Sequence, residues 1–196
     1  GRQRGFSPLD FPSELVGLGA DDGAGVWLLL EMYNAGVPGT YIFHRGEEKG
    51  GIGSKAMSEQ YESFLKQFTH AIAFDRRGTG DVINHQACGR CCSNAFAEQM
   101  CIILSSGVSE VATLSYKPSD GGTFTDTANY VTLIPECTNI SVGYDHEHSP
   151  EEYLDLEHLF QLRARMIEAF LDHPPELVVE RKVTDTDDDR YFYQPS

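Results

Sequence analysis

Basic residues are scarce in this chain of 196 residues. Lysine and arginine together number 15 against 30 aspartates and glutamates, which gives a formal net charge of -15 and a sequence pI near 4.7. Nucleic acids and anionic membrane surfaces need a basic face on the protein that binds them. The charge balance therefore argues against both as partners, while it leaves metal ions and cationic ligands open.

Long apolar runs and a secretion signal are also missing. No stretch approaches the roughly 18 apolar residues of a membrane-spanning helix, and the N-terminus lacks the charged-then-apolar order of a signal peptide. The cysteines number five, and three of them are bunched at Cys88, Cys91 and Cys92. An odd, clustered set does not resemble a disulfide framework, so we expect a reducing compartment and a cytoplasmic protein.

The cysteine cluster has two interpretations. With His85 close by in the sequence, it could supply soft ligands for a structural zinc ion. A second Cys-x-x-Cys or histidine pair is absent, however, and Cys101 falls where a helix could bury it. Buried or inert thiols are therefore favoured over a metal knuckle.

The chain is long enough for one domain with a sizeable core. Apolar periodicity predicts helices at residues 24–35, 55–68, 93–104, 126–133 and 149–171. Short β-prone runs predict strands at residues 40–44, 71–74, 111–116 and 139–144. This alternation indicates an α/β fold in which a mixed β-sheet is flanked by helices in a three-layer sandwich. Residues 1–177 would form the single domain, and residues 178–196 an acidic C-terminal tail.

Several residues mark the expected helix ends. Asp22 is suited to cap the first helix and Gly36 to end it, and Ser93 is suited to cap the helix that follows the cysteines. Ser149, followed by Pro150 and two glutamates, has the pattern of a capped helix start.

Acidic and histidine side chains recur at the ends of these elements. Asp21 precedes a helix, Glu47 and Glu48 follow a strand, Asp75 follows another strand, and His148 precedes the last helix. Ligands of open α/β sheets bind beyond the carboxyl ends of the strands. A set of carboxylates with one imidazole suits zinc or a similar divalent ion. Each residue alone would more simply be a cap or a solvated end, but the five together favour a metal site.

The order and local context of these residues form a recognisable series. It consists of Gly-Ala-Asp-Asp-Gly-Ala-Gly at 19–25, Gly-Glu-Glu-Lys-Gly-Gly at 46–51, Phe-Asp at 74–75, Gly-Thr at 122–123, Thr-Asp-Thr at 125–127 and His-Ser-Pro-x-Glu at 148–152. The series resembles the co-catalytic zinc exopeptidase superfamily, which includes leucyl and glutamyl aminopeptidases and several zinc carboxypeptidases. The resemblance covers about residues 17–160.

The resemblance implies a role for each of the five residues. Asp21 matches a carboxylate that bridges two metal ions, and the peptide bond that follows it is often cis in such enzymes. Glu48 and His148 match ligands of one ion, and Asp75 matches a ligand of the other. Glu47 matches the general base that takes a proton from the attacking water.

One part of the family pattern has no counterpart in this sequence. Family members carry a His-x-Asp motif on a strand upstream of the bridging aspartate, whereas residues 1–20 contain no histidine. By that pattern the Asp21, Glu48 and His148 site is complete and the Asp21 and Asp75 site is one ligand short, so we expect one or two Zn²⁺ ions. Three explanations of the missing ligand are open: the chain is a fragment, a single ion suffices, or another histidine substitutes for the missing one. The candidates for substitution are His44, His70, His85 and His146.

The leading functional interpretation is a zinc-dependent exopeptidase-like hydrolase, and specifically an aminopeptidase, that acts on a peptide or acyl-amino-acid substrate. A zinc carboxypeptidase or amide deacylase is the nearest enzymatic alternative. An inactive metal-binding or interaction protein of the same fold is an alternative of another class. Asp120 and Asp126 are candidate substrate contacts, or else caps or solvated loop carboxylates. A missing upstream strand would leave a sheet edge open, which makes a homo-oligomer possible.

Overall fold

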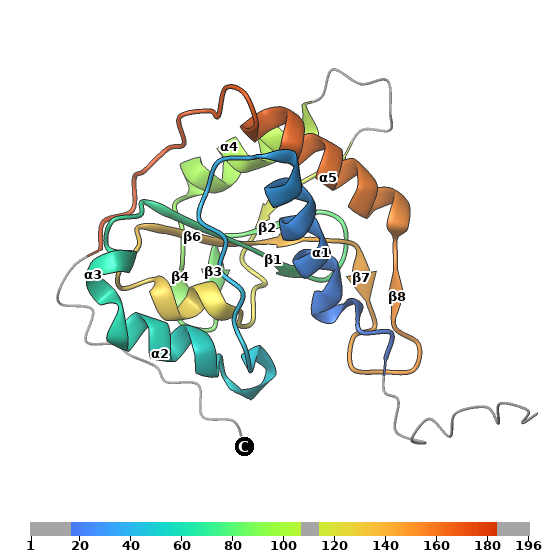
Figure 1. Ribbon diagram of the computed structural model, residues 1–196, viewed down its shortest axis with the longest axis horizontal. Coiled ribbons are helices and arrows are strands. Elements are labelled where there is room, and N and C mark those ends of the chain that lie inside the picture. Colours follow the sequence, from blue (N-terminus) through green and yellow to red (C-terminus); the bar gives the residue numbers. More distant parts are fainter. Residues whose placement is uncertain (1–16, 107–113, 184–196) are drawn as a thin grey trace, which may run out of the picture.

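The computed structural model describes residues 17–106 and 114–183. Within them a four-stranded sheet crosses the molecule between two layers of helices (Figure 1). Its strands lie in the order β1 (His70–Arg76), β6 (Glu136–Ser141), β2 (Asp81–Ile83) and β5 (Lys117–Ser119). Strand β1 is parallel to β6 and β2 is parallel to β5, whereas β2 and β6 are antiparallel. The predicted mixed α/β sheet is confirmed.

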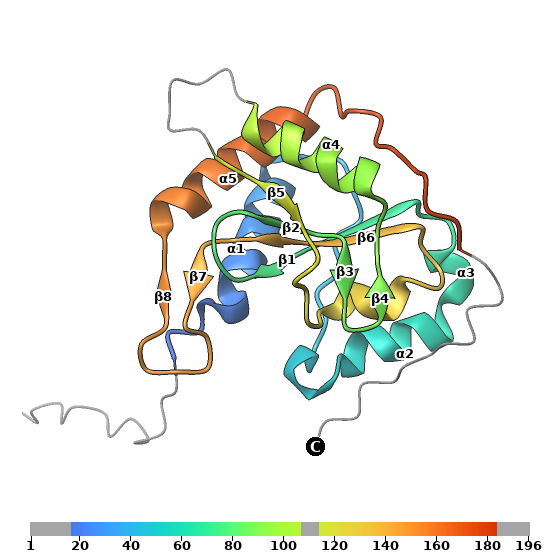
Figure 2. The same cartoon turned by 180° about the vertical axis from the view of Figure 1, so that it is seen from behind.

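The larger core lies on one face of this sheet. The helices α1 (Ala20–Ala35), α4 (Asn94–Ser105) and α5 (Leu156–Phe170) cover that face, as Figures 1 and 2 show. Fully buried side chains such as Leu28 of α1, Phe96 of α4 and Leu162 of α5 meet Val82 and Ile140 of the sheet there. Burial of such side chains is the main source of stability for the layer.

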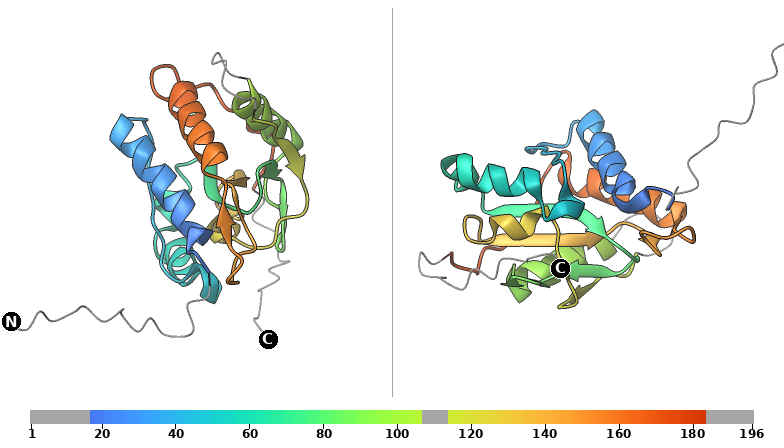
Figure 3. Two further views of the ribbon diagram at one scale, coloured as in Figure 1. Left: turned by 90° about the vertical axis from the view of Figure 1, so that its right-hand side faces the viewer. Right: turned by 90° about the horizontal axis from the view of Figure 1, so that it is seen from below.

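A smaller core lies on the other face. It is covered by α2 (Ile52–Gln60), α3 (Glu62–Leu65) and the 3₁₀ helix η2 (Asp126–Tyr130), seen from below in Figure 3. Leu65, Ile134 and Cys137 are among its fully buried or nearly fully buried members. Two short hairpins complete the described elements: β3 (His85–Gln86) with β4 (Gly89–Arg90), and β7 (Tyr144–Asp145) with β8 (Tyr153–Leu154).

The helix ends follow the predicted residues in three places. Ser93 caps α4 by accepting a hydrogen bond from the backbone N–H of Phe96 at 3.1 Å. Gly36 ends α1 in the left-handed conformation, with φ of 85°. Asp22 accepts a hydrogen bond from the N–H of Gly25 at 3.0 Å, and so caps the regular part of α1. The predicted helix at 55–68 is broken into α2 and α3 at Tyr61.

One predicted strand is wrong, and the last predicted helix begins later than expected. Residues 40–44 form no strand, because their backbone joins no ladder and their side chains face a cavity instead. The last helix starts at Leu156, where Asp155 accepts from the N–H of His158 at 2.9 Å. Ser149 instead donates to the carbonyl of His146. Most of the predicted strand at 111–116 lies outside the described residues, and 114–116 are not in a strand.

A buried carboxylate ties the segment after α5 to the body of the molecule. Glu136, at the start of β6, is completely buried and accepts hydrogen bonds from the N–H groups of Ser93, Glu180 and Arg181. The guanidinium of Arg181 in turn donates to backbone carbonyls at residues 131 and 135. Residues 178–181 therefore lie against the start of β6 and against α4.

No helix within residues 17–106 and 114–183 combines the length and the apolar character that a membrane-spanning helix requires.

Candidate metal centre

The start of α1 places two aspartates on different sides of the chain. The Asp21–Asp22 peptide bond is cis, and both residues have backbone angles outside the helical region. Asp22 turns back to cap the helix at Gly25, whereas Asp21 extends toward His148. The cis bond that the family resemblance implied is confirmed.

Glycines shape the turn that carries the two glutamates. Glu47 and Glu48 lie in the one-turn 3₁₀ helix η1 (Glu47–Lys49), which is flanked by Gly46 and Gly50. Both glycines are left-handed, with φ of 75° and 76°, a conformation that side chains disfavour. Within this turn Glu48 is exposed and reaches His148, while Glu47 is half-buried between two cavities. The two neighbouring glutamates therefore differ: the carboxylate of Glu48 is exposed beside His148, and that of Glu47 is partly enclosed.

Asp75 lies at the irregular end of β1 and is held by its neighbours. Its backbone N–H donates to the Asn139 side chain at 2.8 Å, and the same side chain donates back to its carbonyl. The hydroxyl of Thr125 donates to its Oδ2 at 2.7 Å, and that of Tyr144 to its Oδ1 at 3.3 Å. These bonds fix the carboxylate beside Asp21 at the carboxyl end of the strand.

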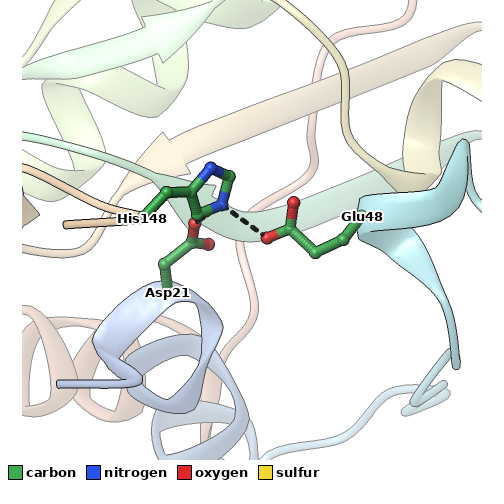
Figure 4. A group of neighbouring side chains, drawn as sticks. All are labelled: Asp21, Glu48 and His148. Carbon is green, nitrogen blue, oxygen red and sulfur yellow. Dashed lines mark hydrogen bonds and ion pairs between the residues drawn. The ribbon is translucent and has the colours of Figure 1, made fainter. Parts of the chain in front are cut away.

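The loop after β7 supplies the imidazole and a carboxylate that holds Asp21. Nε2 of His148 lies 3.0 Å from Oδ2 of Asp21 and 2.9 Å from Oε1 of Glu48. Figure 4 shows the three side chains pointing toward one another. Four residues further on, Glu152 accepts hydrogen bonds from the N–H groups of Gly19 at 3.0 Å and Asp21 at 2.9 Å. Glu152 therefore joins the His148 loop to the backbone of Asp21.

These residues form the one group of three close histidine, cysteine, aspartate or glutamate ligands found within the described ranges. The donor atoms of Asp21, Glu48 and His148 all lie within 4.8 Å of one another. Donors held about 2.0–2.1 Å from a tetrahedral ion lie roughly 3.3 Å apart. The two distances from His148 are close to that value, and two carboxylates with an imidazole are a donor set that zinc accepts. The residues present therefore fit a divalent ion.

The carboxylates around this group repel one another. Burial raises the pKa of Asp22 to about 9 and that of Asp75 to about 7. Burial also raises the pKa of Glu47 to about 8, and the neighbouring charges of Asp75 and Glu48 add to the shift. The pKa of Asp21 is raised by burial and by Glu48, against the opposing effect of His148. A bound cation would favour the ionised form of each of these groups.

Two cavities open beside the group. A cavity of about 490 Å³ is lined by Glu47, Glu48 and His148 together with Arg76 and Arg77. A cavity of about 900 Å³ extends from the same carboxylates along β1. Both volumes lie within the range of small-molecule sites, roughly 300–1,000 Å³.

The predicted site residues are brought together to different degrees. Asp21, Glu48 and His148 share one group, whereas Asp75 adjoins Asp21 and Glu47 lies between the cavities. Asp126 lines the larger cavity, and its Oδ1 is buried without a hydrogen-bond partner. Asp120 is exposed and lines neither cavity.

The four histidines considered as substitutes have other neighbours. His44 lies 2.5 Å from the hydroxyl of Tyr130, and His70 3.1 Å from the carbonyl of Val178. His85 contacts the side chain of Asn84, and the ring of His146 packs against Tyr153. Within the described ranges no group of close ligands includes any of the four. The upstream His-x-Asp segment expected from the family has no counterpart in residues 1–20, of which residues 1–16 lie outside the described residues.

Sequence reasoning missed three residues that hold the site. Glu152 was noted at a helix start and within the family-like series at 148–152 but was given no role at the site, and Thr125 and Tyr144 were noted only as parts of longer segments. The sequence feature that could have identified all three is their position, because each lies within four residues of a predicted site residue or substrate contact. Their hydrogen bonds to Asp21 and Asp75 depend on chain segments more than 45 residues away.

The cysteines lie away from this centre. Five free thiols are present, of which Cys91, Cys92, Cys101 and Cys137 are buried. The thiols of Cys91 and Cys92 both donate to the carbonyl of Ile83. This burial agrees with the preferred interpretation of the cluster.

The sheet, its two helical layers and the cis aspartate pair define an α/β protein of zinc-exopeptidase-like fold. Among solved structures the chain is similar to PhTET1-12s, a dodecamer, with a TM-score of 0.59 and 20% sequence identity. The match covers 77% of this chain and 49% of that chain, so this chain spans about half the length of the solved one. No family model and no curated protein matches the sequence.

Proposed function

We propose that this chain is a zinc-dependent hydrolase of peptide-like bonds, and specifically an aminopeptidase. Asp21, Glu48 and His148 would hold the ion, and Glu47 would act as the general base. The observation that carries the proposal is the convergence of three suitable donors beside a fourth carboxylate that is not among them. A purely structural metal site needs no such extra carboxylate.

The environment of Glu47 suits proton transfer near neutral pH. Its carboxyl is half-buried, and in the metal-free chain its pKa is raised by burial and by the charges of Asp75 and Glu48 to about 8, from which a bound cation would lower it. General bases work best when their pKa lies near the working pH. A bound divalent ion would supply Lewis-acid polarisation of the scissile carbonyl. Glu47 would then accept the proton of the attacking water and return it to the leaving amine.

Asp75 supports a second ion beside the first. It lies next to Asp21, and Thr125 and Tyr144 orient its carboxylate. The pair offers only aspartate donors from the described residues, so we propose weaker binding of this ion than of the one held by His148. The fold neighbour is a TET peptidase, and its dodecameric state is consistent with a homo-oligomer here.

The smaller cavity favours a second candidate activity. Arg76 and Arg77 line it, and Arg77 is exposed and paired with Glu147. An exposed guanidinium can accept a carboxylate, as a carboxypeptidase or an amino-acid deacylase would require. A substrate panel that tests both activities therefore contains aminoacyl anilides, for an aminopeptidase, and N-acylated amino acids, for a carboxypeptidase or deacylase.

The test compares wild type with Glu47→Gln on this panel after both are loaded with zinc. We expect the wild type to hydrolyse at least one substrate class, and Glu47→Gln to lose about a hundredfold or more of its turnover while it retains its zinc. Glu59→Gln, an exposed glutamate of α2, is the matched control and should keep full activity. Undiminished turnover in Glu47→Gln would overturn the role of Glu47, and a zinc-loaded wild type inactive on the whole panel would favour a binding protein.

A further inference from the structure

The cavity of about 490 Å³ extends beyond the metal centre. One of its walls consists of residues 86–87, at the end of β3, and residues 122–124. The two segments are joined by a hydrogen bond from the N–H of Ala87 to the carbonyl of Thr123 at 2.6 Å. None of these residues lines the larger cavity or belongs to the group of three metal donors. A ligand held at the metal centre would therefore meet a second, separate set of side chains here.

Gln86 brings a buried carboxamide to this wall. The residue is 5% exposed, and its Nε2 donates to the hydroxyl of Thr127 at 3.2 Å. That hydroxyl donates in turn to the carbonyl of Thr138 at 3.3 Å, so it must accept the bond from Gln86. The orientation of the amide is thereby settled, with its nitrogen toward Thr127. Its oxygen, Oε1, is buried without a hydrogen-bond partner.

A second unpaired acceptor lines the same cavity. Glu147 accepts from the guanidinium of Arg77 through Oε1 at 3.2 Å, whereas its Oε2 is buried without a partner. The described residues contain three buried side-chain oxygens of this kind, and two of them belong to residues that line this cavity. Buried acceptors are normally paired, because an unpaired one has lost its hydration without compensation. Two in one cavity indicate a ligand that donates hydrogen bonds there.

The guanidinium groups of the cavity restrict the kind of donor. Arg76 lines the cavity and donates through Nε and Nη2 to Asp81, at 3.1 and 3.0 Å. Arg77 has an exposed guanidinium with five N–H groups, and one of its nitrogens is bonded to Glu147. Two positive charges oppose a cationic side chain, and their N–H groups can satisfy a carbonyl oxygen. A neutral carboxamide, with two N–H donors and one carbonyl acceptor, matches this set.

We propose that the smaller cavity binds the side chain of the substrate residue at the scissile bond and selects a carboxamide, as in asparagine or glutamine. Oε1 of Gln86 accepts a hydrogen bond from its NH₂ group, and its carbon stem lies beside Ile83 and Phe124 of the same cavity. The inference deepens the proposed function and rests on it in taking an amino-acyl compound as substrate. A site built around a buried acceptor discriminates strongly against a side chain of the same shape that lacks the donor.

Binding of free amino acids tests this selectivity. Each of the candidate activities releases a free amino acid, which no hydrolase cleaves, so the measurement requires no turnover. Asparagine and leucine have nearly the same shape, as do glutamine and methionine. We expect the zinc-loaded wild type to bind asparagine or glutamine about tenfold or more tightly than its apolar counterpart in calorimetry. Leucine and methionine also control for chelation of zinc by the α-amino and carboxylate groups that all four share.

Paired variants test the position of the contact. Gln86→Met nearly keeps the side-chain volume but removes the acceptor, and it should bring the ratio of the two affinities close to one. Gln67→Met is the matched control, because Gln67 is exposed and lines neither cavity, and it should keep the wild-type ratio. Thr123→Trp, which fills the cavity, should weaken binding of all four amino acids about tenfold. Thr69→Trp, at an exposed threonine outside both cavities, should leave binding unchanged.

Three results would overturn the proposal. The first is no preference for either amide over its apolar counterpart, which would mean that water alone satisfies the acceptor. The second is a preference that persists in folded Gln86→Met, and the third is tighter binding of lysine than of asparagine and glutamine. The proposed hydrolase is tested separately, by turnover of anilides and N-acylated amino acids, so it can fail while the amide preference holds, and the reverse.

Discussion

Residues of the same type have different properties in this centre because their neighbours differ. Glu48 is exposed and lies 2.9 Å from an imidazole nitrogen, whereas the adjacent Glu47 is half-buried among carboxylates that raise its pKa to about 8. Glu152 has the opposite environment, because backbone N–H groups outweigh the effect of its burial and lower its pKa. The proposed roles of ligand, base and positioning group are argued from these contacts.

Glu152 is expected to position Asp21 for ion binding. Its carboxylate holds the N–H groups of Asp21 and Gly19, and so fixes the backbone from which the Asp21 side chain extends. Glu152→Gln should lower zinc affinity about tenfold or more, as is usual for groups that orient metal ligands. Competition with a chelating dye measures this affinity. The exposed neighbour Glu151 is the control, and equal affinity in Glu151→Gln and Glu152→Gln would exclude the positioning role.

The pKa of Glu47 predicts a pH-dependent stability in the metal-free chain. The pKa is raised from an ordinary 4.5 to about 8, so the folded state keeps a proton that the unfolded state has already lost. The resulting stabilisation is fully present below pH 4.5 and is lost as the pH rises to about 8.

Calorimetric melting in EDTA tests this slope. The Tm of the wild type should fall more steeply with rising pH than the Tm of Glu47→Gln, which has no proton to lose at this position. Parallel curves for the two proteins would mean that Glu47 has an ordinary pKa in the folded state.

At the scale of elements, the close approach of α1 to β1 determines where Asp21 and Asp22 lie. A Cβ atom added at Gly25 would lie 1.9 Å from the carbonyl oxygen of Phe74, a distance that no side chain tolerates. One added at Gly23, in the same helix, would have nothing within 4 Å. Only a glycine at position 25 lets the helix start contact the strand that carries Asp75.

The two glycines of α1 form a matched pair for mutagenesis. Gly25→Ala should destabilise the fold by about 1–3 kcal/mol or more because α1 must move away from β1. Gly23→Ala should be neutral or slightly stabilising, since alanine favours helices by up to about 1 kcal/mol. Urea unfolding of both variants measures the free energies. Similar destabilisation by the two would contradict the packing described.

Sequence patterns identified elements whose signals are local. The helix capped by Ser93 and the buried strand at 71–74 were predicted closely, because caps and apolar periodicity depend on neighbouring residues. Residues 40–44 look like a strand, yet strand formation also requires a partner that the described chain does not offer them. Ser149 has the sequence of a cap, but its hydroxyl bonds to His146 and the helix begins at Asp155.

At the scale of the whole molecule, the sequence motifs predicted the members of the site better than the way in which they are held. Asp21, Glu48 and His148 were identified from their order in the chain, and they meet although up to 127 residues separate them. The cavity along β1 could not be predicted, because its walls come from both helical layers and from the connection between α1 and η1. Contacts of this kind depend on tertiary packing, which local patterns do not encode.

The most direct test of the account is the number of zinc ions that each chain retains after loading and exhaustive dialysis. The wild type should retain at least one ion per chain, because Asp21, Glu48 and His148 offer three converging donors. His148→Ala should retain close to none, and His173→Ala, which changes an exposed histidine elsewhere, should match the wild type. Equal zinc in His148→Ala and wild type, or no zinc in a folded wild type, would contradict the assignment of this centre.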